Sequence, residues 1–77
     1  MDIQDQKGRL QGQLRNRFGR HFEITTLSDD LVVYDRADKR QAHGSYEMIR
    51  QIAAGASDEE SFWRECEAAG LLCPPQQ

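Results

Sequence analysis

Two histidines and two cysteines are the side chains of this sequence best suited to hold a metal ion: His21, His43, Cys66 and Cys73. Four such ligands are the number that a structural zinc ion needs, but such sites usually supply them in pairs roughly two to five residues apart. Here the histidines are 22 residues apart, and six residues separate the cysteines. The spacing therefore predicts no zinc site, and we expect no other cofactor. Cys66 shares a helical face with Phe62, so we expect it to fill the core.

Nucleophilic catalysis has an equally weak basis. A histidine stands close to a serine in His43-Gly44-Ser45, but no glycine-framed nucleophile elbow surrounds the serine, and helix capping already explains it. The glycines near the N-terminus follow no strand, so they form no phosphate-binding loop. A chain of 77 residues also hardly encloses a catalytic pocket of about 300 Å³. We therefore expect a protein that is not an enzyme.

Basic residues are concentrated at the N-terminus, where three arginines fall on one flank of an amphipathic pattern: Arg9, Arg17 and Arg20. Clustered cations are what phosphate contacts require. The chain as a whole carries a net charge of −3, however, which opposes the approach of DNA or RNA. Nucleic-acid binding through these arginines is thus the alternative hypothesis, and direct binding is not what we expect.

Aromatic and acidic residues favour a protein partner instead. Trp63 lies at the edge of the apolar face of the last predicted helix and Tyr34 ends a strand, and both residue types anchor interfaces. The alternative for Trp63 is that it simply closes the core of a small domain. Acidic residues of a turn and of the last helix could compete for a basic nucleic-acid groove on a partner; they are Asp29, Asp30, Asp58, Glu59 and Glu60.

The elements that must position these residues follow from hydrophobic periodicity and turn chemistry. Helical spacing predicts a first helix over 3–18, and apolar, β-branched runs predict strands over 22–27, 31–34 and 40–43. Ser45 caps a helix over 46–54. Ser57 to Glu60 has the pattern of a capping box for a last helix that ends near Ala69, with Gly70 in the left-handed position after it. The connections between strands are too short for parallel crossovers. The sequence therefore predicts an α+β fold in the order α-β-β-β-α-α, with a three-stranded antiparallel meander.

We expect residues 1–77 to form one domain, with an ordered core over about 3–73 and a flexible tail over 74–77. No apolar run is long enough to span a membrane, and no secretion signal is visible. These features predict a cytoplasmic protein that does not enter membranes. A domain this small buries little surface, so a homodimer is a further expectation.

Together these features predict a small non-enzymatic module that binds a larger protein or protein complex. Small, acidic domains without motifs are a common product of phages and mobile elements, including anti-CRISPR-like inhibitors of host defence. An inhibitor of a nucleic-acid-processing machine is therefore our specific hypothesis, and a nucleic-acid-binding or regulatory accessory protein is the alternative.

Overall fold

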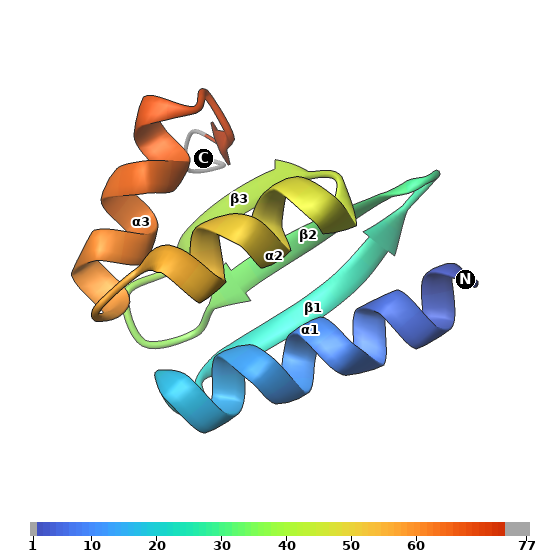
Figure 1. Cartoon of the computed structure of the whole chain (residues 1–77), viewed down its shortest axis with the longest axis horizontal. Helices are drawn as coiled ribbons and strands as arrows, with labels where there is room; N and C mark the ends of the chain where they lie inside the picture. The colour runs from blue at the N-terminus through green and yellow to red at the C-terminus, as the bar shows by residue number, and fades with distance from the viewer. Residues whose placement is uncertain (1, 74–77) are drawn as a thin grey trace.

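The computed structural model describes residues 2–73, the last of them by its backbone alone (Figure 1). The predicted order of three helices around three consecutive antiparallel strands is confirmed, and a short fourth strand follows the last helix. The elements are α1 (Ile3–Arg17), β1 (Phe22–Leu27), β2 (Asp30–Asp35), β3 (Arg40–Gly44), α2 (Tyr46–Gly55), α3 (Glu59–Ala68) and β4 (Leu72–Cys73).

The sheet is an antiparallel meander in the order β1-β2-β3-β4. A two-residue turn joins β1 to β2, with Ser28 in the left-handed region at φ 56°. A four-residue turn joins β2 to β3, and in it the Asp35 carboxylate accepts hydrogen bonds from the backbone N–H groups of Ala37 and Asp38. β4, which was not predicted from the sequence, pairs with only two residues of β3.

The helices and the sheet form two layers with one core between them (Figure 1). Alternate residues of the strands point into this core and meet the buried faces of all three helices, as the period of two along a strand requires. The opposite face of the sheet carries Thr25, Val32 and Tyr34, which are exposed or half-buried. Within residues 2–73, no helix has both the length and the apolar composition of a membrane span.

The ends of the helices show which local signals operate. Ser45 caps α2 as predicted, and its hydroxyl accepts from the backbone N–H of Met48. The cap of α3 is Asp58 rather than Ser57, so the predicted capping box of Ser57 and Glu60 is wrong: Ser61 rather than Glu60 stands at the third position of the helix. The backbone N–H of Ser61 donates to the Asp58 carboxylate, and this bond holds the pKa of Asp58 below its usual value. Gly70 adopts φ 75° and ends α3 as expected.

The predicted tail over 74–77 lies outside the described residues.

Candidate interaction surfaces

Trp63, expected at a partner-binding surface, is buried and only 3% of it is exposed. Its ring stacks on Phe22 with centroids 5.9 Å apart, and it meets Phe62 edge-on at 5.2 Å. The Arg40 guanidinium also lies over the indole, 5.0 Å from its centroid. Trp63 therefore closes the core, which was the alternative role considered for it, and it cannot serve as an exposed anchor.

A charged cluster surrounds the Arg40 side chain at the end of the sheet where α3 begins. Arg40 contacts four carboxylates at 3.0–3.6 Å: Asp35, Asp38, Glu59 and Glu60. The His21 imidazole adds a contact of 2.8 Å to Glu59, and its Nε2 lies 3.8 Å from Asp35. Two of the predicted partner-binding acids, Glu59 and Glu60, are thus engaged in ion pairs within the protein.

Three side chains of this cluster, His21, Asp35 and Glu59, place possible metal-ligating atoms within 4.8 Å of one another. Arg40 already supplies the cation that these two carboxylates face. A metal ion would have to share Asp35 and Glu59 with a positive charge less than 4 Å away, which is unfavourable. The arrangement is that of an ion-pair network that ties β2, β3 and α3 together.

The acidic residues predicted to form one face do not lie together. Asp29 and Asp30 are at the β1–β2 turn, where Asp30 pairs with His43 at 3.2 Å. Glu59 and Glu60 lie beside Asp35, at the other end of β2. Six strand residues span about 17 Å, so these two groups sit at opposite ends of the sheet. Tyr34 is on the sheet face that the helices leave uncovered, and it is half-buried.

The arginine flank considered for nucleic-acid binding is also divided. Arg17 donates hydrogen bonds to the carbonyl oxygens of Ala53, Ala54 and Ala56 at the end of α2. These are carbonyls that a helix leaves without partners at its C-terminus, and the helix dipole favours a cation there. Arg17 therefore fastens α1 to α2. Arg9 and Arg20 are exposed and remain as two separate cations.

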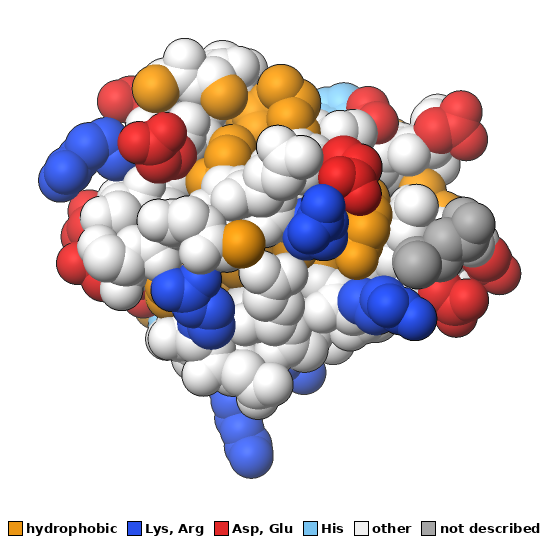
Figure 2. Space-filling view, viewed as in Figure 1, with side chains coloured by type: hydrophobic (Ala, Val, Ile, Leu, Met, Phe, Trp, Pro, Cys, Tyr) orange, Lys and Arg blue, Asp and Glu red, His pale blue; other side chains and the backbone are white. Residues whose placement is uncertain are grey.

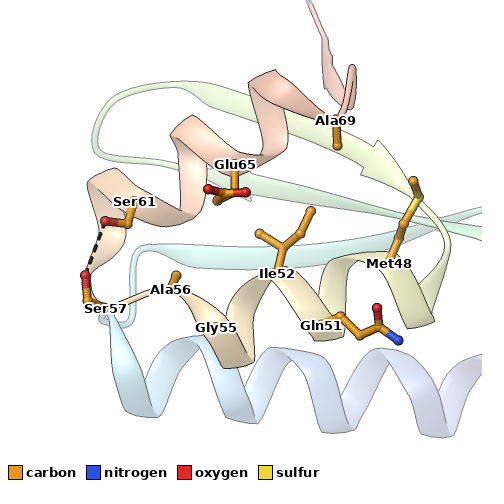
Figure 3. A pocket seen from close by; sticks show the side chains of 9 residues that line it. All are labelled: Met48, Gln51, Ile52, Gly55, Ala56, Ser57, Ser61, Glu65 and Ala69. Carbon is orange, nitrogen blue, oxygen red and sulfur yellow. Dashed lines mark hydrogen bonds between the residues drawn. The ribbon is translucent and has the colours of Figure 1, made fainter.

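A groove of about 630 Å³ lies between α2 and α3. Figure 2 shows hydrophobic side chains reaching the surface between these two helices. Figure 3 shows Ile52 extending from α2 toward α3 and Glu65 facing the same space from α3. The lining residues are Met48, Gln51, Ile52, Gly55, Ala56, Ser57, Ser61, Glu65 and Ala69.

None of these groove residues was singled out from the sequence. Ile52 and Met48 stand in the apolar arc of α2, where periodicity marks them as core positions like their neighbour Ile49. The structure buries Ile49 completely but leaves 44% of Met48 exposed. The sequence feature that could have predicted the groove is the wide apolar arc of α2, because α3 covers only part of this arc.

Cys66 is buried in the core as expected. Burial, with a smaller repulsion from Glu65, raises the pKa of its thiol from 9.0 to about 12. The thiolate is the reactive form, so this cysteine is chemically inert at neutral pH. His21 and His43 each lie against a carboxylate rather than against Cys66. The side chain of Cys73 lies outside the described residues.

Comparisons of this chain with protein-family models, with curated proteins and with solved structures find no match.

Proposed function

We propose that this protein is a non-enzymatic binding module that captures another protein on the groove between α2 and α3. The observation that carries the proposal is the open groove of about 630 Å³ whose walls expose apolar side chains to water. Leaving apolar surface in water forgoes about 25 cal/mol for every Å² that could be buried. A partner that covers the groove would recover this free energy, which supports an interaction site here.

Met48 supports the proposal at one end of this groove. It is 44% exposed, one of two large hydrophobic residues described as exposed, and the other is Leu27 on the far side of the sheet. Methionine is flexible and polarisable, which suits a contact surface that must adapt to a partner. Trp63, which first suggested a partner, contributes to this site only by packing α3 against the core.

The more specific hypothesis concerns the kind of partner. Exposed acids on α3, including Glu65 and Glu67, outnumber the single exposed base Arg64 on the same helix. This surplus supports a partner with a basic surface, such as a nucleic-acid-processing machine. An anti-CRISPR-like inhibitor encoded by a phage or mobile element is the form of this hypothesis that we retain.

The alternative hypothesis of direct nucleic-acid binding is less well supported by the structure. It required three neighbouring free cations, and Arg17 instead holds the end of α2.

A capture experiment with two matched double variants tests the proposal. Met48→Lys/Ala69→Lys changes exposed residues of the groove, whereas Thr25→Lys/Leu27→Lys makes the same charge change at exposed residues of the uncovered sheet face. Circular dichroism first verifies that both variants fold. We expect a partner cross-linked by the wild type in extracts of the source cells to be lost by the groove variant only. Equal capture by the groove variant would contradict the proposal.

A further inference from the structure

We infer that the groove between α2 and α3 accepts an amphipathic helix that carries a lysine or arginine opposite Glu65. This inference rests on the proposed function, because it names the kind of segment that the same groove binds. It follows from three properties of the groove: its backbone, its side-chain sizes and its charge.

The backbone of the groove offers few partners to an extended peptide. Its two walls are helices, whose interior backbone N–H and C=O groups bond within the helix, and of the lining residues only Ala56, Ser57 and Ala69 lie outside these helices. Three carbonyls near the end of α2, those of Ala53, Ala54 and Ala56, already accept from Arg17. A peptide in extended form would lose water from its own backbone groups and find little to replace it. A helix satisfies its backbone internally and avoids this cost, so the groove selects a helical segment.

The size of the lining side chains allows such a helix to come close. Five of the nine lining residues are glycine, alanine or serine: Gly55, Ala56, Ser57, Ser61 and Ala69. Larger apolar side chains at Met48 and Ile52 supply the surface on which a partner's apolar residues pack. The lining residues of α2 run from Met48 to Gly55, so the groove extends along about 10 Å of that helix and matches about two turns of a partner helix.

The charge of the groove specifies the polar contact. Glu65 is its one charged lining residue, and its side chain is exposed. Among residues 2–73, no hydrogen bond or ion pair engages its carboxylate, whereas Glu59 and Glu60 have partners. An apolar groove with one unpaired carboxylate complements an apolar helix face with one cation.

A display library of random peptides of about 16 residues, a length that permits helix formation, tests this inference without a known partner. Binders are selected on the wild-type protein and counter-selected on Met48→Lys/Ala69→Lys. We expect the enriched peptides to carry apolar residues at helical spacing with a lysine or arginine among them. Glu65→Gln should weaken their binding about two- to fivefold, the range of an exposed ion pair. Glu67→Gln, on the same helix but outside the groove, should leave binding unchanged.

A double-mutant cycle then tests the contact between Glu65 and the cation of a selected peptide. Once that cation is replaced by methionine, Glu65→Gln should not weaken peptide binding further. Enriched peptides that are proline-rich, extended or acidic overturn the inference, as does an equal effect of Glu65→Gln and Glu67→Gln or the absence of any groove-dependent peptide. The two proposals fail separately. Suppose that the groove variant fails to capture the natural partner but the library yields extended peptides. The proposed function then holds, and the inference that the groove binds a helix is wrong.

Discussion

A completely buried aspartate is the residue on which one end of the fold depends. Asp35 has no exposed surface, and its carboxylate is satisfied by two turn N–H groups and by Arg40. A buried charge is tolerated only when it is both paired and hydrogen-bonded, and Asp35 meets both conditions. The same carboxylate therefore shapes the β2–β3 turn and anchors the network that reaches α3.

Replacing Asp35 should lower the free energy of unfolding, and the loss should grow with the number of these contacts that the substitution removes. We expect Asp35→Ala to lower the free energy of unfolding by about 3 kcal/mol, because Arg40 and two turn N–H groups lose a buried partner. Asp35→Asn keeps an acceptor for the turn and should fall between Ala and the wild type. Asp38→Asn is the control, since Asp38 pairs with Arg40 at the surface and such pairs contribute less than about 1 kcal/mol. Urea denaturation measures all three, and equal losses at both positions would contradict this assignment.

The buried thiol of Cys66 predicts a stability change at high pH. Its pKa is raised to about 12 in the folded protein, whereas the unfolded thiol titrates near 9.0. Above the unfolded pKa the unfolded state loses a proton that the folded state keeps, so stability falls as the pH rises from 9.0 toward 12. Between about pH 9 and pH 10 this should remove about 1 kcal/mol.

Cys66→Ala isolates this effect from the titration of lysines and tyrosines. The free energy of unfolding of this variant should fall less steeply with pH than that of the wild type above about pH 9. Parallel curves would show that the thiol does not titrate as its burial requires.

At the scale of elements, the contact between α1 and α2 depends on Arg17. Each helix has an N-cap but also a weakness, since α1 contains Gly8 and Gly12 and α2 has no basic residue in its last turn. Arg17 supplies the missing cation from a neighbouring helix, and in doing so it positions one wall of the groove.

Arg17→Ala should lower the free energy of unfolding by about 1–2 kcal/mol, as expected for charge-assisted hydrogen bonds that are partly exposed. Arg9→Ala, on the same helix, is exposed without a described partner and should change stability by less than about 0.5 kcal/mol. Thermal and urea unfolding of the two variants compare them directly. If Arg17→Ala and Arg9→Ala lower the free energy of unfolding by the same amount, Arg17 does not hold α1 and α2 together.

At the scale of the whole molecule, charge decides which partners can approach. The protein carries a net charge of −3, and its paired and unpaired acids lie at both ends of the sheet and on α3. Counterion release by several clustered cations drives nucleic-acid binding, and only Arg9 and Arg20 remain free of the set of three.

We therefore expect no appreciable binding to DNA or RNA at about 150 mM salt, where charges act over roughly 8 Å. Fluorescence anisotropy with labelled duplex DNA and single-stranded RNA, repeated at about 50 mM salt, measures this. Arg9→Glu/Arg20→Glu serves as the control and keeps Arg17 in place. Tight binding that weakens steeply with salt and disappears in this variant would restore the nucleic-acid hypothesis.

Local sequence patterns predicted the three helices and the first three strands in their order, but not β4. Helical spacing in α1, the β-branched runs of β1 and β2, and the signals at Ser45 and Gly70 all act within a few residues, so a linear pattern contains them. The same local rules were too coarse to separate Ser57 from Asp58 as the cap of α3, because both residues suit that position.

Which residues are free to act depends on contacts between elements that lie far apart in the sequence. Arg17 meets carbonyls 36 to 39 positions away, and Arg40 meets Glu60 20 positions away. Trp63 is buried because Phe22 and Arg40, which come from the sheet, pack against its ring. A linear pattern marks a side chain as apolar or charged, but its exposure depends on which distant element packs against it. For the same reason the groove beside Met48 became visible only once α3 was placed next to α2.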